Sequence, residues 1–236
     1  MLDKKRILVF SASYNEKENI QKLILGINKH LPDAEILIID DNSPDHTKDI
    51  IIKIQQNLEK LKLIVRDEKM GLDTAHKYAY QYAVKNNYEY LITMDADLSH
   101  DPKELPNFIK YLNQNPFVIG SRYIPGGSCE MKGSRLIISK IGNFVIKKFS
   151  KINCNEFTTS YRGFNIKMLD KFDLNHVKEK GYSFFMGTLF EINKKKYPIK
   201  EIPITFFDRS KGVSKIPKIE IFRTFLNLLI RIFKKN

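Results

Sequence analysis

Runs of consecutive apolar residues alternate with stretches in which apolar residues recur every three or four positions along the first 120 residues. The consecutive runs predict buried strands, at Arg6–Phe10, Ile36–Ile39, Leu61–Val65, Tyr90–Met94 and Phe117–Gly120. The recurring pattern predicts helices between them, at about residues 17–30, 46–54, 71–85 and 103–113. Because strands and helices alternate, we expect one Rossmann-like α/β domain, with a mainly parallel central sheet and helices on both faces.

Length and charge narrow the class of protein. A chain of 236 residues can build one such domain with a sizeable core. Its 40 Lys and Arg against 27 Asp and Glu give a net charge of +13, which predicts an anionic partner: a nucleic acid, a membrane surface or a phosphorylated small molecule. Its two cysteines form no CxxC pair, so a reducing compartment is the default. No stretch approaches the roughly 18 to 20 apolar residues of a membrane-spanning helix.

Polar and aromatic side chains follow the ends of three predicted strands. Tyr14 and Glu16 follow the first strand, Asp41 the second, and Asp95 and Asp97 the fourth. Ligands bind beyond the carboxyl ends of the strands in open α/β sheets, and there a ring can stack on a base while carboxylates accept from a ribose or a base edge. This set suits a nucleoside diphosphate compound. The chain lacks GxGxxG after the first strand and lacks GxxxxGK[ST], so a dinucleotide site is disfavoured and a P-loop is excluded.

The segment MDADLSHDP (94–102) at the end of the fourth strand is the candidate metal site. Asp95 and Asp97 can reach one point if the chain leaves extended geometry there. Like charges that close destabilise each other, and a divalent cation relieves the repulsion; oxygen ligands favour Mg²⁺ or Mn²⁺. The alternative is an acidic loop followed by a helix cap at Asp101 and Pro102. His100 sits beside this turn and is treated as an accessory residue.

Several segments, in consistent order, together resemble one known family. They are YNEKENI (14–20), IIDDNSPDHT (38–47), MGLDTA (70–75), MDADLSHDP (94–102), IGSRYIPGG (119–127), Arg135 with SKIGN (139–143), TTSYRGFN (158–165) and FFDRSKGVSK (206–215). The chain thereby resembles the inverting family 2 glycosyltransferases, and within them the dolichol-phosphate mannose synthases and related polyprenyl-phosphate glycosyltransferases. The resemblance implies a GT-A fold, and it implies transfer of a hexose, above all mannose from GDP-mannose, to a polyprenyl phosphate.

The resemblance also implies roles for individual residues. The nucleotide-sugar donor would be held by Ser13, Tyr14, Glu16 and Asp41, the metal by Asp95, Asp97 and Ser99, the acceptor phosphate by Arg122, Arg135 and Ser139, and the diphosphate by Arg209 and Lys215 of a closing loop. Asp97, Arg122 and Arg135 are the candidate catalytic residues. A lipid phosphate is already ionised near neutral pH, so catalysis needs positioning and charge stabilisation of the leaving diphosphate rather than a strong general base. Glu156 departs from the Asp that family members usually carry, which bears on specificity.

Residues 217–236 form a separate segment beyond a glycosyltransferase domain of residues 1–216. Phe222, Phe225, Leu226 and Leu229 recur at helical spacing, with basic residues on the opposite side. Such an amphipathic helix can lie on an anionic bilayer or pack on the domain, and the periodicity does not separate the two. Since a lipid acceptor must be met at a membrane, we expect a peripheral protein at the cytoplasmic face of one; the sequence indicates no particular protein partner.

Three alternative functions stay open at this point. One is a family 2 transferase that uses a UDP-sugar or a glycan acceptor. A second, from another class, is a basic nucleic-acid-binding protein; acidic residues at the presumed cleft would repel a nucleic acid backbone, so we expect no nucleic acid partner. A third is an inactive scaffold of the same fold, which the intact Asp95–Asp97 pair disfavours.

Overall fold

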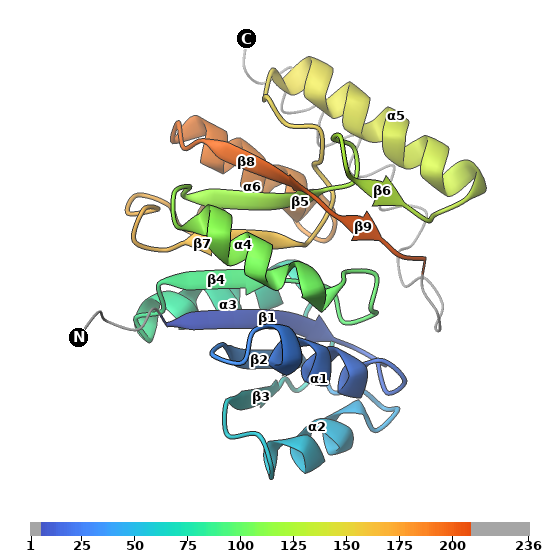
Figure 1. The fold of residues 1–236 in the computed structure, drawn as a ribbon, viewed down its shortest axis with the longest axis vertical. Coiled ribbons are helices and arrows are strands. Elements are labelled where there is room, and N and C mark those ends of the chain that lie inside the picture. Colours follow the sequence, from blue (N-terminus) through green and yellow to red (C-terminus); the bar gives the residue numbers. More distant parts are fainter. Residues whose placement is uncertain (1–5, 209–236) are drawn as a thin grey trace.

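A seven-stranded sheet forms the centre of residues 6–208, the part of the chain that the structure, a computed structural model, describes (Figure 1). The strand order is β3-β2-β1-β4-β7-β5-β8, and of these seven strands β7 alone runs antiparallel to its neighbours. The strands are β1 (Ile7–Ser13), β2 (Glu35–Asp40), β3 (Leu61–Val65), β4 (Tyr90–Thr93), β5 (Phe117–Ser121), β7 (Arg162–Asn165) and β8 (Ile199–Pro203). A short parallel pair is formed by β6 (Ser128–Cys129) and β9 (Thr205–Phe206).

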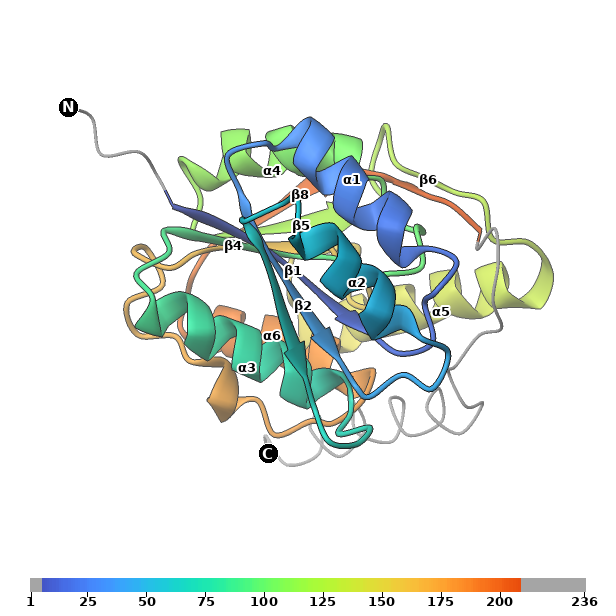
Figure 2. The same cartoon turned by 90° about the horizontal axis from the view of Figure 1, so that it is seen from below.

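Helices cover both faces of this sheet. They are α1 (Ile20–His30), α2 (Thr47–Gln55), α3 (Leu72–Lys85), α4 (Leu105–Leu112), α5 (Gly133–Ser150) and α6 (Ser183–Lys194), with 3₁₀ turns η1 (Pro102–Glu104) and η2 (Leu174–His176). Successive strand residues face opposite ways, so Leu8 and Phe10 pack with α3 and α6 while Val9 packs with α1 and α4 (Figure 2). The predicted fold class, a mainly parallel sheet with helices on both faces, is confirmed.

The first helix begins at Ile20 rather than at about residue 17. The backbone amide of Glu16 donates to the Thr47 hydroxyl (3.0 Å), and that of Lys17 donates to the Asp45 carboxylate (3.0 Å). These bonds tie the chain to the loop before α2 and hold it in a turn, which delays the helix. Tertiary contacts therefore override the local helical pattern at this position.

The carboxyl ends of β1, β2 and β4 meet at one edge of the sheet. Ser13 pairs with Asp40 across β1 and β2, and Phe10 pairs with Thr93 across β1 and β4. The segments that follow these strands are therefore neighbours in space. The predicted helix at 217–236, and with it the domain boundary at residue 216, lies outside the described residues. Within residues 6–208, no helix has both the length and the apolar character that crossing a bilayer requires.

Candidate active site

Asp40, the last residue of β2, anchors the loops that follow β1 and β2. Its carboxylate is fully buried and accepts hydrogen bonds from the hydroxyl of Ser13 (2.7 Å) and from the amide (2.8 Å) and hydroxyl (2.6 Å) of Ser43. The Ser43 hydroxyl in turn accepts from the amide of Asn15 (2.9 Å). Ser13, predicted to hold the nucleotide, thus lies at the strand end and is oriented by a carboxylate that sequence reasoning passed over in favour of Asp41.

Asp41 is held by Arg66, which directly follows β3. The two side chains form an ion pair, and each is only 10% exposed. Arg66 also donates to the Thr74 hydroxyl (2.6 Å) and the Gly71 carbonyl (3.1 Å) at the start of α3. The carboxylate is therefore fixed in place at the strand edge. Arg66 was not predicted, although its position immediately after a strand is the same signal that identified Asp41.

Tyr14 and Glu16 lie in the loop between β1 and α1, and both are half-buried. The ammonium of Lys69 lies 4.5 Å from the centre of the Tyr14 ring. The Glu16 carboxylate accepts from the side-chain amide of Asn19 (2.8 Å). Both predicted nucleotide-binding side chains therefore sit at the same sheet edge as Ser13 and Asp41.

The chain turns sharply after β4, as the metal-site prediction requires. Leu98 has a φ of 64°, a left-handed conformation that non-glycine residues rarely adopt. The turn lets the amide (3.0 Å) and hydroxyl (2.6 Å) of Ser99 donate to the carboxylate of Asp97, which is 6% exposed. Asp95 is more open and accepts from the Ser160 hydroxyl (2.5 Å). Ser99, predicted as a metal ligand, is fully buried and contacts Asp97.

His100 supports the backbone of this turn from the buried side. The Nδ1 atom of its fully buried ring accepts from the amide of Asp95 (3.1 Å), so Nε2 carries the proton and donates to the Thr159 hydroxyl (3.1 Å). Burial lowers the pKa of His100, against an opposing effect of Asp95 and Asp97. The neutral ring is therefore a fixed support for Asp95, a larger role than the accessory one expected from sequence.

The carboxylates of Asp95 and Asp97 fit a small divalent cation that arrives with a substrate. Among residues 6–208, no cluster of three His, Cys, Asp or Glu side chains is arranged to hold a metal. A complete protein cage is not needed for Mg²⁺, which usually takes one or two carboxylates, substrate phosphate oxygens and water. Two carboxylates, one of them partly open, match that requirement.

A buried ion pair joins Arg122, just after β5, to Glu156. The guanidinium donates Nε to one carboxylate oxygen (2.7 Å) and Nη2 to the other (2.8 Å), and Nη2 also reaches the Thr158 hydroxyl (2.8 Å). Glu156 is completely buried. Burial alone would lower the pKa of Arg122 and raise that of Glu156, but their mutual attraction outweighs it, so the pKa of Arg122 is raised and that of Glu156 lowered. Both groups stay charged.

The two other predicted acceptor-phosphate residues lie on α5. The Ser139 hydroxyl is 2.7 Å from the hydroxyl of Tyr123, the neighbour of Arg122. Arg135 is exposed and lies 3.6 Å from the carboxylate of Asp208. Asn143, one turn further, is buried and accepts from the amide of Phe157 (2.7 Å). The contacts of Ser139 and Asn143 therefore hold α5 beside Arg122.

Residues 156–160 connect the turn that carries Asp95 and Asp97 to Arg122, which follows β5. Within this 156–160 segment, Glu156 holds Arg122, Thr159 holds His100, and Ser160 holds Asp95. The segment is itself braced by the fully buried Arg162, which donates to the carbonyls of Phe157 (3.1 Å), Thr159 (2.8 Å) and Phe185 (2.7 Å). Burial lowers the pKa of Arg162 to about 9. The structure thus brings the predicted metal pair and Arg122 to one place.

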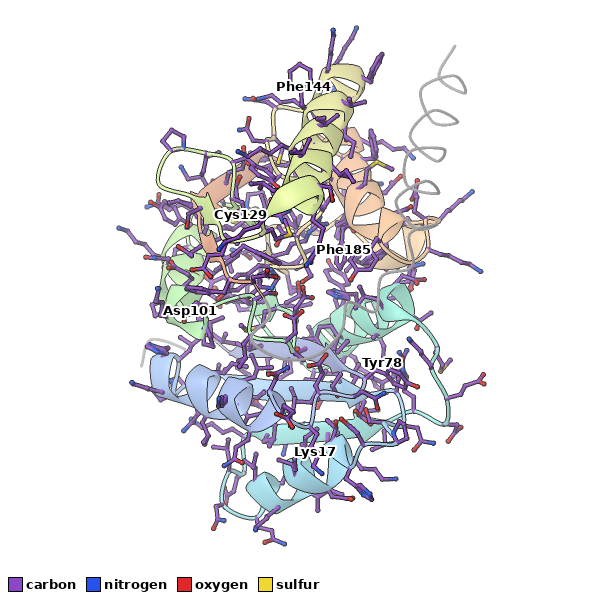
Figure 3. The ribbon with its side chains drawn as sticks, turned by 90° about the vertical axis from the view of Figure 1, so that its right-hand side faces the viewer. Lys17, Tyr78, Asp101, Cys129, Phe144 and Phe185 are labelled. Carbon is purple, nitrogen blue, oxygen red and sulfur yellow. The ribbon has the colours of Figure 1, made fainter. Side chains whose placement is uncertain are left out.

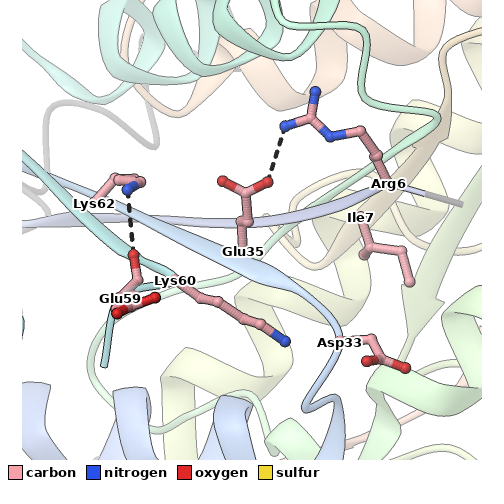
Figure 4. Close-up of a pocket in the computed structure, with 7 residues that line it drawn as sticks. All are labelled: Arg6, Ile7, Asp33, Glu35, Glu59, Lys60 and Lys62. Atoms are coloured by element: carbon pink, nitrogen blue, oxygen red, sulfur yellow. Dashed lines mark hydrogen bonds and ion pairs between the residues drawn. The ribbon is translucent and has the colours of Figure 1, made fainter. Parts of the chain in front are cut away.

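Not every predicted residue can be placed, and not every depression belongs to this site. Arg209 and Lys215 lie outside the described residues. The pocket in Figure 4 lies at the amino ends of β1, β2 and β3, the edge of the sheet opposite to the site. It is lined by Arg6, Ile7, Asp33, Glu35, Glu59, Lys60 and Lys62. None of these residues belongs to the strand-end set.

The sequence of this chain is similar to one protein family and to named members of it. The sequence matches the family described as Glycosyl transferase family 2 over residues 9–173. It is 32% identical over 214 residues to the polyprenol monophosphomannose synthase of Mycolicibacterium smegmatis, covering 89% of this chain and 81% of that protein. It is 31% identical over 212 residues to the undecaprenyl-phosphate mannosyltransferase of Micrococcus luteus, covering 89% and 87% respectively.

Solved glycosyltransferases have the same fold. Glucosyl-3-phosphoglycerate synthase from Mycobacterium tuberculosis, in complex with Mn²⁺, UDP and glucosyl-3-phosphoglycerate, superposes with a TM-score of 0.68 at 14% identity, covering 97% of this chain and 80% of that chain. A mannosyltransferase from Pyrobaculum calidifontis, in complex with GDP-Man and Mn²⁺, gives 0.59 at 18% identity, covering 99% and 64%. At these identities the likeness shows the fold, and it confirms the predicted GT-A class.

Proposed function

Because this chain belongs to glycosyl transferase family 2, we propose that it moves mannose from GDP-mannose to a polyprenyl phosphate, with inversion at the sugar carbon. The observation that carries the proposal is its similarity, over 89% of its length, to two enzymes whose names specify mannose and a polyprenyl phosphate. The geometry supports it, because an acidic turn and a buried arginine meet at one edge of the sheet.

The donor would be bound by the loops after β1 and β2. Asp40 presets Ser13 at the edge of the sheet, and Arg66 presets Asp41. Tyr14 offers an aromatic face for the base. Since Ser13 and Asp41 are already held by Asp40 and Arg66, binding a nucleotide would cost little reordering of these two side chains.

The metal would be held by Asp95 and Asp97. A bound Mg²⁺ or Mn²⁺ supplies charge stabilisation to a leaving diphosphate. Ser99 keeps the Asp97 carboxylate in place through two hydrogen bonds, Ser160 donates to the Asp95 carboxylate, and His100 accepts from the backbone amide of Asp95. These contacts support a role for Ser99 in orienting Asp97, beside the predicted role as a metal ligand.

The acceptor phosphate would meet Arg122, Arg135 and Ser139. Arg122 is locked as a cation by Glu156 and is held in one orientation by two parallel hydrogen bonds. The acceptor oxygen carries its own negative charge, so the protein's task is to align it with the sugar carbon rather than to remove a proton. The acceptor is a membrane lipid, and we therefore propose that the protein works at a membrane surface.

A transfer assay tests this function. Purified protein with Mn²⁺ or Mg²⁺ and a short polyprenyl phosphate should transfer label from GDP-mannose, and not from UDP-glucose or UDP-N-acetylglucosamine supplied in parallel. Asp97→Asn should abolish transfer and metal-dependent nucleotide binding. Asp101→Asn is the matched control, because Asp101 caps η1 through the amide of Lys103 and asparagine caps equally well. Transfer from a UDP-sugar alone, or to a glycan alone, would contradict the proposal.

A further inference from the structure

Asp73, in the first turn of α3, contacts a segment that lies 108 residues further along the chain. Its side chain is only 6% exposed, and its carboxylate accepts a hydrogen bond from the backbone amide of Gly181 (3.0 Å). Gly181 lies two residues before α6 and has a φ of 57°, a left-handed conformation that glycine adopts without strain. The carboxylate therefore ties the start of α3 to the start of α6.

The start of α3 is fixed by the donor half of the site. Arg66, which holds Asp41, also donates to the Gly71 carbonyl (3.1 Å) and to the Thr74 hydroxyl (2.6 Å). These two acceptors lie on either side of Asp73 in the sequence. Asp73 is thus placed by the same arginine that places Asp41, while its own carboxylate is directed at α6.

The start of α6 is joined to the 156–160 segment on its other side. The carbonyl of Phe185 accepts from Arg162 (2.7 Å), and the Arg162 guanidinium lies 5.0 Å from the centre of the Phe185 ring. Arg162 donates to two carbonyls of the 156–160 segment as well. Along the long axis of the molecule, Phe185 lies between Tyr78 of α3 and Phe144 of α5 (Figure 3). The start of α6 therefore connects α3 to the segment that holds the metal pair and the buried ion pair.

Close packing makes the start of α6 and the residues before it one unit. A Cβ added at Gly187, in the second turn of α6, would meet the Glu179 carboxylate and would lie 2.8 Å from Cγ1 of Val177. Because Gly187 has no side chain, residues 177–181 lie directly on the helix. The hydrogen bond from Asp73 to this stretch therefore fixes the position of α6 itself and not only that of a loop.

We propose that Asp73 is a positioning residue for sugar transfer. It sets the start of α6, and through Arg162 the 156–160 segment, relative to the loops that follow β1 and β2. Its effect on catalysis rests on the proposed function, in which the acceptor oxygen must be aligned with the sugar carbon; a misplacement of about 1 Å can cost about a hundredfold in rate. Since the carboxylate contacts Gly181 rather than the residues proposed to bind the donor, its loss should reduce transfer and leave donor affinity unchanged.

Steady-state kinetics of the full-length protein test this role. Asp73→Ala should lower kcat/KM for a short polyprenyl phosphate by about tenfold to a hundredfold. The Kd for GDP at saturating Mn²⁺ should change by less than about twofold, because the donor residues keep their own partners. Asp73→Asn retains an oxygen that can accept from the Gly181 amide and should restore most of the transfer rate.

Asp173→Ala is the matched control for a general loss of stability. The Asp173 carboxylate accepts from the side-chain amide of Gln81 in α3 (2.8 Å) and from the backbone amide of Asn175 (2.8 Å). The control therefore also removes a carboxylate that ties α3 to a distant segment, but near the other end of the helix. Its kcat/KM should stay within about twofold of the wild-type value.

Four results would overturn the proposal. They are normal transfer by Asp73→Ala, an equal loss in Asp73→Asn, an equal loss in Asp173→Ala, and a GDP affinity that falls by the same factor as kcat/KM. The second result would show that the hydrogen bond to Gly181 does not matter. The third would reduce the role to general stability, and the fourth would make Asp73 part of the donor site.

Hydrogen exchange measures the connection without any substrate. Asp73→Ala should speed exchange of the Gly181 amide by about tenfold or more, because a charge-assisted hydrogen bond is lost. Faster exchange should extend to the amides of the 156–160 segment, and it should not appear there in Asp173→Ala; unchanged exchange in that segment would contradict the connection. If the wild-type protein transfers no mannose but exchange changes as expected, the proposed function fails while the placement of the segment by Asp73 stands. If mannose is transferred and Asp73→Ala transfers it equally well, the positioning role fails alone.

Discussion

Replacing Glu156 with glutamine should destabilise the domain far more than neutralising a surface carboxylate. Glu156 is completely buried and makes two hydrogen bonds to Arg122, whose side chain is 5% exposed. Glutamine keeps the shape and can still accept from the amides of Thr158 and Thr159, which bond the same oxygen in the native side chain. The variant therefore removes chiefly the charge and leaves the Arg122 cation buried without a carboxylate.

The size of the loss follows from that burial. Removing one partner of a buried ion pair costs roughly 3–5 kcal/mol, which is a large part of the roughly 5–15 kcal/mol that stabilises a typical domain. Burial lowers the pKa of Arg122, and the charge and hydrogen bonds of Glu156 are the largest effects that raise it, so the buried cation depends chiefly on that carboxylate. In contrast, the Asp101–Lys103 pair is exposed on its lysine side, and exposed pairs contribute at most about 1 kcal/mol.

Urea unfolding of the two variants measures the difference. Glu156→Gln should lower the free energy of unfolding by about 3 kcal/mol or more, and Asp101→Asn by less than about 1 kcal/mol. Adding Arg122→Met to Glu156→Gln should recover more than half of the loss, because the buried cation is then gone as well. A loss below about 1 kcal/mol for Glu156→Gln, or no recovery in the double variant, would refute the reasoning that the pair is desolvated and mutually dependent.

Other consequences of the buried network can be measured in the same way. His76 is buried among Phe10 and two phenylalanines of α6, and burial lowers its pKa to about 3. Because the unfolded chain has a histidine pKa near 6.5, it binds more protons between pH 3 and 6.5, so this contribution to stability is fully present above about pH 6.5 and is lost as the pH falls. The loss in the free energy of unfolding is about 2 kcal/mol at pH 5. Urea unfolding at pH 7.5 and pH 5 should therefore show a smaller pH dependence of this free energy for His76→Leu than for the wild type. An equal pH dependence in the two proteins would contradict the reasoning. Asp40→Asn should lower the free energy of unfolding by about 1–3 kcal/mol and weaken GDP binding in calorimetric titrations. Unchanged GDP affinity would show that the Ser13 loop keeps its position without the carboxylate. Arg66→Gln should weaken GDP binding in the same titrations because Asp41 loses its ion-pair partner, and normal GDP affinity would show that Asp41 needs no positive partner.

The first half of the fold could be predicted because its strands are continuous apolar runs. Residues such as Leu8, Val9, Leu91 and Ile92 are buried on both faces of a parallel sheet, so each strand is recognisable without its partners. Element ends were less predictable. Where α1 begins depends on bonds from its entry turn to the loop before α2, which lies about thirty residues further along the chain.

The second half could not be predicted in the same way, because its strands do not have strand-like sequences. β7 reads Arg162-Gly163-Phe164-Asn165, and a buried arginine in a central strand is acceptable only because three backbone carbonyls from two different segments accept its hydrogen bonds. Gly163 has no side chain there, and an added Cβ would lie 2.8 Å from Leu112 of α4. Both features are determined by neighbours in space rather than by the local pattern.

In the candidate site, too, some residues could be predicted from the local sequence and others could not. The rule that ligands bind beyond strand ends located Tyr14, Asp41, Asp95 and Asp97 from sequence. Ser99 and His100 were named from sequence because they lie in the same turn, but which carboxylate each partner holds could not be inferred, and the other partners lie far along the chain. Arg66 lies 25 residues from Asp41, and Ser160 lies 65 residues from Asp95. Sequence reasoning therefore identified the carboxylates and the ring of the candidate site and missed Arg66 and Ser160, which orient two of them.

The 156–160 segment makes the donor and acceptor halves of the site mechanically dependent on each other. Thr159 reaches Asp95 through His100, Glu156 holds Arg122, and the amide of Phe157 is fixed by Asn143 of α5. The rings of His100 and Phe206 are 5.6 Å apart, and the Arg122 guanidinium lies 5.0 Å from the same Phe206 ring. A displacement of α5 would therefore pass through a short, buried chain of contacts to the metal pair.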